Sequence, residues 1–332
     1  MTRILTGIKP TGTPHIGNLL GAIRPALALA ALPDTEAMYF IADYHALTTV
    51  HDGKALAELT REVAATWLAF GLDPERTLFY RQSDVPETFE LAWILACFTS
   101  KGWMNKMHAY KARVQDQGTD AETADAGINV GLYTYPILMA ADILLFDTDL
   151  VPVGKDQVQH VEIARDMAQR VNHTFKAELL RLPQAKVEEQ TAVVVGLDGR
   201  KMSKSYDNVI PLLAPAKQLR KTVNRIVTDS TPPEAPKDPD TSHIFQLYKL
   251  FATPEQVAAL DGRYRAGIGW GDAKGALADV LEATLAGPRA TYEALMADPA
   301  SVEALLVRGA ERARAYARPV LQRLREAIGI RR

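Results

Sequence analysis

The stretch GIKPTGTPHIGN, from Gly7 to Asn18, follows a β-type run and precedes a helical one. At such a strand-to-helix turn, backbone N–H groups and the N-terminus of the helix can receive a phosphate group. Gly12 and Gly17 allow a ligand to approach the backbone closely, and His15 can donate a hydrogen bond to a phosphate oxygen. Taken alone, the stretch fits an ordinary tight turn with a surface histidine equally well.

Short β-type runs alternate with helical patterns on either side of this turn. The predicted strands are Arg3–Ile8, Ala37–Asp43, Thr77–Gln82, Asp149–Val153 and Thr191–Gly196. The clearest amphipathic stretches carry apolar residues at helical spacing from Leu56 to Phe70 and from Val158 to Val171. This alternation predicts an α/β fold, a Rossmann-like parallel sheet with helices on both faces, in which ligands bind at the carboxyl ends of the strands.

The β-type runs stop after Lys204, and the rest of the chain has helical patterns. The predicted helices are about Ala214–Val227, Ser242–Leu250, Pro254–Leu260, Asp272–Ala286 and Val302–Ile328. We therefore expect two domains, a catalytic domain over residues 1–200 and an α-helical domain over residues 201–332.

The composition is that of an ordinary globular protein, with 47% hydrophobic residues and a formal net charge of −2. This charge argues against a protein coated in positive charge but does not exclude a local nucleic-acid surface. The single cysteine, Cys97, excludes an internal disulfide and is expected in the core. The apolar run Leu19–Leu32 is too short to span a membrane, so we expect neither signal peptide nor anchor, and a cytoplasmic location.

A second motif, DGRKMSKS, runs from Asp198 to Ser205 just beyond the last predicted strand. Lys201 and Lys204 place two ammonium groups on a loop, which suits the negative charge that develops on a leaving pyrophosphate. A basic pair in a loop is more often simply a solvated surface. The second motif therefore indicates a phosphate-binding function only when it is considered together with the first one.

The stretch PILMAADILLFDTDL, from Pro136 to Leu150, places Asp142 among apolar residues. A carboxylate is costly to bury unless a donor hydrogen-bonds to it, and we expect this donor to come from a bound ligand. The alternative is that Asp142 occupies a solvent-facing helix position.

The pair of HIGN near the first strand and KMSKS after the last resembles the class I aminoacyl-tRNA synthetases. The stretch YPILMAADILLFDTDLVPVGKDQVQHVE, from Tyr135 to Glu162, narrows the resemblance to the tryptophanyl-tRNA synthetases, as a somewhat divergent bacterial-type member. The resemblance implies attack of the tryptophan carboxylate on the α-phosphorus of ATP, which gives tryptophanyl-adenylate and pyrophosphate. Tryptophan then passes to tRNA(Trp). No protein nucleophile is needed, because positioning and charge stabilisation carry the rate.

The resemblance also implies roles for residues on the ATP side. Catalytic roles fall to His15, Asn18, Lys111, Lys201 and Lys204. ATP contacts fall to Lys9, Pro10, Thr11, Gly17, Asn18, Gly154, Lys155, Asp156, Val193, Lys201, Met202, Ser203, Lys204 and Ser205. Of these, Gly154 and Asp156 would meet the ribose, although Asp156 could instead compensate a helix dipole. Mg²⁺ would arrive with ATP, with no dedicated protein site.

For the amino acid, the resemblance implies a pocket at the carboxyl ends of the strands. It would be formed by Leu5, His45, Tyr135, Met139, Asp142, Val151, Val153 and Gln157. Tyr135 and Gln157 would hold the α-amino group, while Met139 and Val153 have core packing as their alternative. Asp142 would be the specificity residue, since indole has one N–H donor and an ionised carboxylate only accepts.

Several residues depart from the family pattern. Lys9 stands where many relatives have glutamine, Leu5 where an aromatic residue is common, and Lys155 where glutamate is frequent. Tyr206 follows KMSKS where aspartate or asparagine is common, and Pro25 should kink or end the helix after HIGN. These residues mark a divergent branch and bear on the exact phosphate and carboxylate contacts.

The C-terminal segment, residues 301–332, contains eight arginines and three glutamates, a local net charge of +5. Such a basic stripe suits phosphate contacts, although an ordinary solvated helix face explains it equally well. The family implies a homodimer with tRNA bridging the subunits. Two rival functions remain: a tyrosine-specific synthetase of the same architecture, and a synthetase-like interaction or regulatory protein that charges no tRNA.

Overall fold

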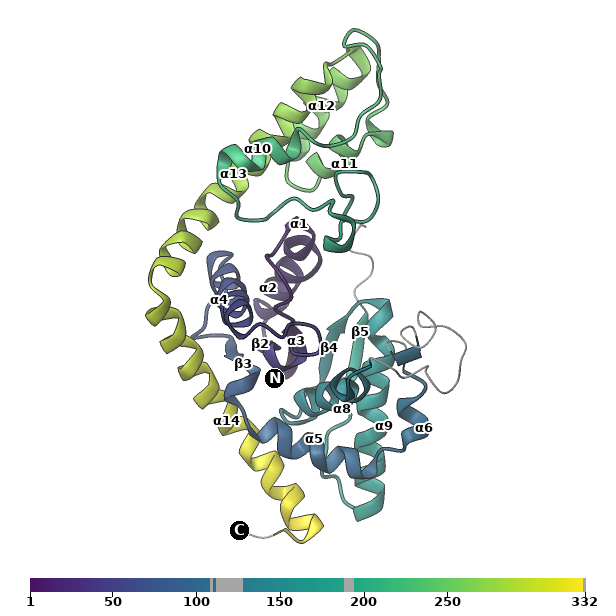
Figure 1. Cartoon of the computed structure of the whole chain (residues 1–332), viewed down its shortest axis with the longest axis vertical. Helices are drawn as coiled ribbons and strands as arrows, with labels where there is room; N and C mark the ends of the chain where they lie inside the picture. Colours follow the sequence, from purple (N-terminus) through teal and green to yellow (C-terminus); the bar gives the residue numbers. More distant parts are fainter. Residues whose placement is uncertain (108–109, 112–127, 188–193, 331–332) are drawn as a thin grey trace.

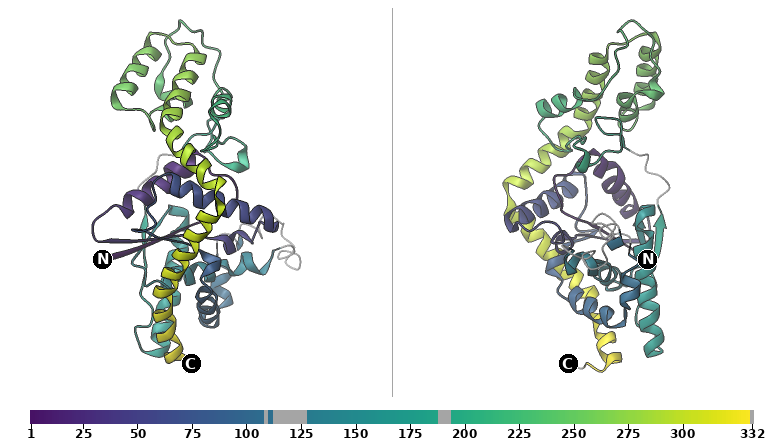
Figure 2. Two further views of the ribbon diagram at one scale, coloured as in Figure 1. Left: turned by 90° about the vertical axis from the view of Figure 1, so that its left-hand side faces the viewer. Right: turned by 45° about the vertical axis from the view of Figure 1, so that its right-hand side comes forward.

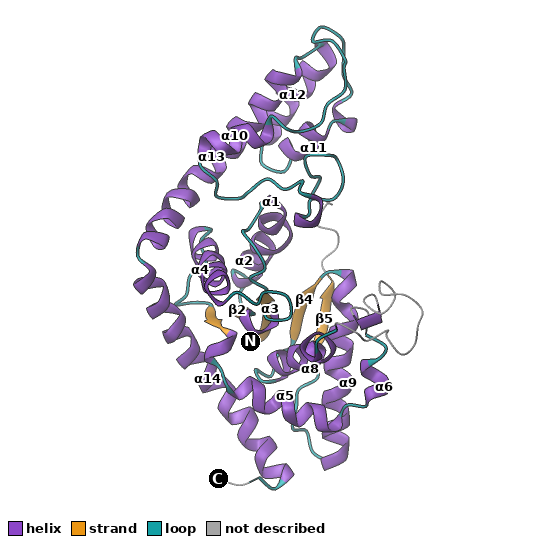
Figure 3. Cartoon of the chain, viewed as in Figure 1, coloured by secondary structure: helices purple, strands orange, loops and turns teal. Residues whose placement is uncertain are grey.

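The computed structural model describes residues 1–107, 110–111, 128–187 and 194–330. Its described strands form one parallel sheet in the order β3-β2-β1-β4-β5 (Figure 3). They are β1 (Thr2–Ile8), β2 (Thr35–Ile41), β3 (Leu78–Arg81), β4 (Leu150–Val153) and β5 (Gln184–Val187). The strand order reverses between β1 and β4, the switch point at which α/β sheets bind ligands. The predicted Rossmann-like sheet is confirmed.

Helices surround this sheet and continue beyond it (Figure 1). In the first two-thirds of the chain they are α1 (Ile16–Asn18), the π-helical η1 (Leu19–Ile23), α2 (Arg24–Ala30), α3 (Asp43–Ala46), α4 (Gly53–Ala69), η2 (Gln82–Asp84), α5 (Glu87–Phe98), α6 (Lys101–Met104), α8 (Val130–Leu144), η3 (Lys155–Gln157) and α9 (Val158–Phe175). Further along are η4 (Lys204–Tyr206), α10 (Ala216–Val223), η5 (Pro239–Thr241), α11 (His243–Tyr248), α12 (Pro254–Ala266), α13 (Trp270–Ala297) and α14 (Pro299–Ile328). The predicted helical character of the C-terminal third is confirmed.

Both faces of the sheet are buried, because alternate residues of a strand point to opposite sides. Tyr39 and Phe79 face a core cluster that includes buried residues of η1 and α4. Met38 and Tyr80 face a second cluster that includes residues of α5, α8, α9 and α14. The helices therefore cover the sheet on two sides, as the alternating pattern predicts.

The fifth strand lies elsewhere than predicted. It is formed by Gln184–Val187, which pairs in parallel with β4. Of the predicted strand Thr191–Gly196, residues 191–193 lie outside the described part of the chain, and Val195 makes only an isolated bridge to Lys201. Gln184–Val187 is short, polar and partly exposed, so it lacks the apolar run by which a buried parallel strand is recognised.

The two C-terminal helices are longer than predicted. Helix α13 continues through Pro288, and α14 begins at Pro299 and continues through Pro319. Figures 1 and 2 show them as one long bent arc, along which α14 returns to lie against β3 and α5. Pro288 and Pro319 each remove one backbone donor from a helix interior, but burial of the apolar face outweighs this loss. Pro299 lies in the first turn of α14, where the N–H would have no partner within the helix. The last helix thus packs on the sheet.

Two local expectations have different outcomes. The segment after HIGN passes directly from the π-helical η1 into α2 at Arg24, with Pro25 in the first turn of α2, so the helix does not end at the proline. The kink at Pro25 stays a prediction. Cys97 is exposed, which contradicts its predicted core position. It lies on α5, where Leu91, Ile94 and Leu95 form the buried face, and a continuous apolar run does not show which side of a helix faces outward.

Candidate active site

A cavity of about 530 Å³ lies at the switch point between the carboxyl ends of β1 and β4. Its wall is formed by the end of β1 and the following turn, by α3 and α8, and by the end of β4. All eight residues predicted to bind the amino acid line it: Leu5, His45, Tyr135, Met139, Asp142, Val151, Val153 and Gln157. Met139 and Val153 also pack against the core, so both interpretations of these two residues describe their surroundings.

Asp142 points inward from α8 and is only 2% exposed. Its Oδ1 and Oδ2 accept from Nε2 of Gln82 at 2.9 and 2.8 Å, and Oδ2 lies 3.0 Å from Nε2 of His45. An ionised carboxylate only accepts, so the histidine nitrogen is the donor. The expectation that the donor comes only from a ligand is therefore wrong, and so is the solvent-facing alternative. Burial raises the pKa of Asp142, while the bonds from His45 and Gln82 oppose that rise.

Gln82 is a member of the site that the sequence pattern did not single out. It follows β3 directly in η2 and is fully buried. Its position at the carboxyl end of a predicted strand was the available signal, because such positions converge on the ligand-binding edge. The cavity is also lined by Thr6, Gly7, Phe40, Ala42, Thr48, Leu132, Ile143 and Pro152, which were not predicted.

Polar side chains also line the same cavity. Tyr135 shares a hydrogen bond with Nε2 of His160 across 2.6 Å, and burial raises the pKa of the tyrosine. Lys9 donates to Oγ1 of Thr48 at 2.8 Å. Lys9 lines the cavity together with Gly154. This bond holds the unusual Lys9 in the wall of the cavity.

The HIGN and KMSKS regions meet beside this cavity. Ile16 donates its backbone N–H to the carbonyl of Ile210 at 3.0 Å, and Leu212 donates to the carbonyl of Pro14 at 3.0 Å. Lys204 lies over Gly12, where a Cβ would be 2.9 Å from the lysine Nζ. Gly12 has a φ of +142°, so it also supplies a backbone conformation that side chains disfavour.

His15 is buried at this junction. Burial, with a smaller effect from the positive charge of Lys204, lowers its pKa to about 4. The ring is therefore neutral near pH 7 and carries one N–H donor. A second cavity of about 410 Å³ has both His15 and Lys204 in its wall. The backbone N–H of His15 donates to Oδ1 of Asn18 at 3.0 Å, so Asn18 also closes the first turn of α1.

Asn208 fixes the shape of the KMSKS loop. Its Oδ1 accepts from the backbone N–H of Ser203 at 2.8 Å, and its Nδ2 donates to Asp198 and to the carbonyl of Lys201. Met202 is buried, whereas both lysines of the motif are exposed. The aromatic ring of Tyr206 lies 4.4 Å from the guanidinium carbon of Arg200, which provides a local reason for this departure from the family pattern.

Some of the predicted site residues do not line either of the two cavities or lie outside the described part of the chain. Lys111 is exposed, and neither cavity has it among its described lining residues. Val193 and the side chain of Asp156 lie outside the described part of the chain. Pro10 is buried, while Thr11, Lys155 and Ser205 are exposed.

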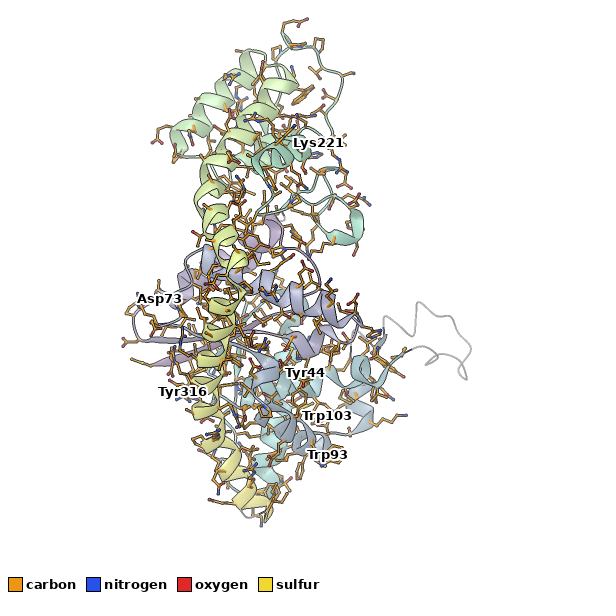
Figure 4. The ribbon with its side chains drawn as sticks, turned by 60° about the vertical axis from the view of Figure 1, so that its left-hand side comes forward. Tyr44, Asp73, Trp93, Trp103, Lys221 and Tyr316 are labelled. Carbon is orange, nitrogen blue, oxygen red and sulfur yellow. The ribbon has the colours of Figure 1, made fainter. Side chains whose placement is uncertain are left out.

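Most of the described arginines in the basic stripe of α14 form hydrogen bonds with other parts of the chain. Five of its six described arginines bond to other helices and turns: Arg312 to the carbonyl of Pro74, Arg314 and Arg318 to Glu87, Arg323 to Asp147, and Arg325 to Glu90. Tyr316 on the same helix, labelled in Figure 4, bonds to Glu36 of β2. Four of these five arginines pair with carboxylates distant in sequence, so the stripe carries less unpaired positive charge than the sequence suggests. Its contact with phosphates stays a prediction.

Neither a metal cluster nor a membrane-spanning helix occurs in the part of the chain that the structure describes. Its residues include no group of three or more His, Cys, Asp and Glu side chains placed to hold a metal ion. None of its helices is long and apolar enough to cross a membrane.

Comparisons with known proteins agree with this geometry. Residues 1–286 match the family described as class I tRNA synthetases (W and Y). The tryptophan–tRNA ligase of Pseudomonas aeruginosa is 54% identical over 99% of this chain and 74% of its own length, and that of Neisseria meningitidis is 53% identical over 99% and 98%. The crystal structure of tryptophanyl-tRNA synthetase from Campylobacter jejuni complexed with ADP and tryptophan matches with a TM-score of 0.92 and 44% identity, over 99% of this chain and all of that one. The chain therefore belongs to the class I aminoacyl-tRNA synthetases, in the family of the tryptophan–tRNA ligases.

Proposed function

We propose that this chain activates L-tryptophan with ATP and transfers the amino acid to tRNA(Trp), with the cavity between β1 and β4 as the tryptophan site. The observation that carries the proposal is Asp142, a buried acceptor in a cavity whose other walls are largely apolar. Indole presents one N–H donor and no acceptor, so the two groups match one to one.

The same acceptor explains how the site would reject other aromatic amino acids. Phenylalanine would fill the cavity but leave the acceptor without its ligand donor, and sites built around a hydrogen bond discriminate strongly against such analogues. Tyrosine has a donor, but on a narrower and shorter aromatic system. Leu5, Val151 and Met139 would contact the indole ring from the apolar walls. Tyr135 and Gln157 would hold the α-amino group.

The phosphates of ATP would lie where HIGN meets KMSKS. Gly12 lets the lysine approach the turn, and the neutral His15 can donate to a phosphate oxygen without adding charge. Lys204 and Lys201 would neutralise the charge that develops on the departing pyrophosphate. Gly154 and Asp156 would contact the ribose, and the backbone near Val193 the adenine.

We further propose that Mg²⁺ enters with the ATP phosphates, which would supply oxygen ligands themselves. The side chains of the site would then act by positioning and by electrostatic stabilisation. In the first step, the nucleophile is the tryptophan carboxylate. In the second step, it is a ribose hydroxyl on the terminal adenosine of the tRNA. Neither step requires a covalent bond to the protein.

For the assembly, we propose a homodimer. Its support is a group of exposed aromatic residues, Tyr44 of α3 with Phe89 and Trp93 of α5, of which Trp93 is 73% exposed. Tyr44 and Trp93 are labelled in Figure 4. The rings of Tyr44 and Phe89 contact each other edge to face, with centroids 4.4 Å apart, and exposed apolar patches of this kind mark interaction sites. Residues 201–332 would form the anticodon-binding part, with the tRNA bridging the subunits. Because charged tRNA is used at the ribosome, we propose a cytoplasmic location.

An ATP–pyrophosphate exchange assay with tryptophan, tyrosine and phenylalanine tests the substrate. We expect exchange with tryptophan alone, and exchange with tyrosine but not tryptophan would reject the proposal in favour of the tyrosine-specific rival. Charging of tRNA(Trp) transcript by the same preparation tests the second step. Exchange without charging would favour the interaction or regulatory protein.

A further inference from the structure

Gln82 is the least exposed polar residue around the cavity, and its side-chain NH2 group contacts both oxygens of Asp142. The amide orientation is determined by chemistry, because the ionised carboxylate can only accept and the amide nitrogen can only donate. The opposite end of the amide, Oε1, is buried and has no hydrogen-bond partner among the described residues. A core-filling side chain would gain nothing from this arrangement, since an unpaired buried oxygen carries a cost.

The main chain around Gln82 is held from both sides. Arg81 bonds to Asp84 and to Glu303 of α14 at distances from 2.7 to 3.0 Å. On the other side, the backbone N–H of Ser83 donates to Oδ1 of Asp43 at 3.0 Å. The amide nitrogen is thus delivered to a fixed place beside the carboxylate. Such support from neighbouring residues is what keeps a recognition group in its working geometry.

An ionised carboxylate offers about four acceptor positions. In Asp142 three contacts within the chain are accounted for, two from Gln82 and one from His45. This leaves acceptor capacity on a carboxylate that already forms part of the cavity wall. We propose that Gln82 is a positioning residue for amino-acid selection, which keeps Asp142 ionised and orients it so that its remaining lone pair accepts the indole N–H. This inference rests on the proposed function and goes beyond it, because it assigns a role to the residue that positions the Asp142 carboxylate.

The surroundings of Asp142 define how its charge responds to a change at Gln82. Helix α3 contributes His45 as a donor and Asp43 as a second negative charge, while β3 contributes the buried phenol of Tyr80. On α8 itself, Tyr135 lies against His45, with ring centroids 6.2 Å apart, and bonds to His160 of α9. Without the Gln82 donor, His45 is the remaining side chain that donates to Asp142 among the described residues. The carboxyl group would then hold its proton to higher pH.

Two substitutions of similar size separate a positioning role from simple space filling. Gln82→Met removes both polar ends of the side chain. Gln82→Glu keeps the shape but replaces the donor by a group that can donate only when it is protonated. Gln322→Met on the exposed face of α14 is the matched control, because Gln322 bonds to Glu326 there and touches neither cavity. Circular dichroism melts verify that each variant is folded.

The assay is pyrophosphate exchange by the full-length chain, with tryptophan and with its benzothienyl analogue, in which sulfur replaces the indole N–H. We expect Gln82→Met to lower kcat/KM for tryptophan by about tenfold or more, mostly through KM, the loss typical of one hydrogen bond to a charged group. KM for ATP should stay within about twofold. The analogue should lose less than tryptophan, because it has no donor to offer Asp142.

The pH profiles provide the sharper test. With Gln82→Met, the acid limb of kcat/KM for tryptophan should move to higher pH, because Asp142 then ionises later. With Gln82→Glu, we expect the loss of kcat/KM for tryptophan on the alkaline side of the profile instead. The introduced carboxyl group can still donate at low pH, where it is protonated, whereas two neighbouring carboxylates repel each other as the pH rises, so activity should fall on the alkaline side.

The outcomes separate this inference from the proposed function. If the unaltered chain does not exchange with tryptophan, the proposed function fails. If it does exchange, but Gln82→Met affects tryptophan and its analogue equally and leaves the pH profile unchanged, Gln82 only fills space and the inference is overturned. Should Gln82→Met fail to fold, the Gln82→Glu profile decides alone, and an unchanged alkaline side overturns the inference.

Discussion

Gly309 of α14 packs directly on the backbone carbonyl of Phe79 in β3, so closely that a Cβ on the glycine would overlap the carbonyl oxygen. This contact sets how near the last helix approaches the edge of the sheet. Arg81, two residues further along β3, bonds to Glu303 of the same helix. The C-terminal helix is therefore part of the support on which the end of β3 and Gln82 rest.

We expect Gly309→Ala to destabilise the protein by about 2 kcal/mol or more, because the neighbouring group is backbone and cannot rotate away. Gly275→Ala in α13 is the matched control, since a Cβ there meets nothing within 4 Å. That substitution should instead stabilise by about 0.5–1 kcal/mol through helix propensity. Urea unfolding measures both, and equal effects would contradict the close contact of α14 with β3.

Gly12→Ala should impair the use of ATP rather than of tryptophan. The new Cβ would displace Lys204, and the φ of +142° at this position strains any side chain. We expect kcat/KM for ATP to fall by about tenfold or more, as for loss of one charge-assisted contact. Gly21→Ala, where a Cβ meets nothing within 4 Å, serves as the control. An unchanged kcat/KM for ATP would mean that Lys204 does not act from this place.

Asp142→Ala should weaken the use of tryptophan far more than the binding of ATP. The change removes the acceptor and leaves the donors of Gln82 and His45 without their partner, so a loss of about 100-fold in kcat/KM for tryptophan is expected. Separate titrations of tryptophan and ATP in the exchange assay measure the two effects. Equal losses for both substrates would show that Asp142 is structural.

His15 should make the folded state less stable in weak acid. Its pKa is lowered to about 4 in the folded protein, whereas an unfolded histidine titrates near its ordinary value of 6.5. As the pH falls from 6.5 toward about 4, the unfolded chain binds a proton at this histidine before the folded protein does. The free energy of unfolding that His15 contributes above pH 6.5 is therefore lost progressively as the pH approaches 4. Because the ring adjoins an open cavity, we expect a loss of about 1–2 kcal/mol.

Urea unfolding at about pH 7.5 and about pH 4.5 measures this loss, on either side of the ordinary histidine pKa. His15→Gln should remove a corresponding part of the pH dependence, and His51→Gln at an exposed position should leave it in place. The same slope in all three proteins would show that His15 does not remain neutral when buried.

Arg314→Met should reduce stability and leave tRNA use nearly unchanged. Glu87 is 9% exposed and accepts from both Arg314 and Arg318, so the substitution withdraws one partner from a buried carboxylate. We expect a loss of about 1–2 kcal/mol that grows smaller with salt. Arg308→Met, at an exposed arginine of the same helix, is the control. A marked rise in KM for tRNA with Arg314→Met would instead support the phosphate-contact interpretation of this arginine.

Local patterns identified most of the catalytic part of the chain. Apolar alternation located β1 to β4, and glycine with histidine at a strand-to-helix turn located the HIGN junction. The eight residues that the family resemblance implied for the amino acid line one cavity, at the edge where the carboxyl ends of the parallel strands meet. Their chemical roles stay predictions.

Long-range pairing accounts for what was missed. Gln82 and His45 approach Asp142 across 60 and 97 positions of sequence. The stripe of arginines on α14 looks free in the sequence, but Glu87, Glu90 and Asp147 neutralise most of it only after the helix has docked. β5 was missed for a related reason, since its pairing with β4 compensates for a weak apolar pattern.

The amino-acid sequence was sufficient to predict the first four strands, the helical C-terminal third, the two phosphate-type motifs and the anomaly of Asp142, because each depends on neighbours within a few residues along the chain. The inward orientation of Asp142 and its bonds to Gln82 and His45 became visible only in the folded chain. Hydrogen bonds and ion pairs between distant segments depend on the distance between their atoms in the folded chain, and spacing along the sequence carries no record of that distance.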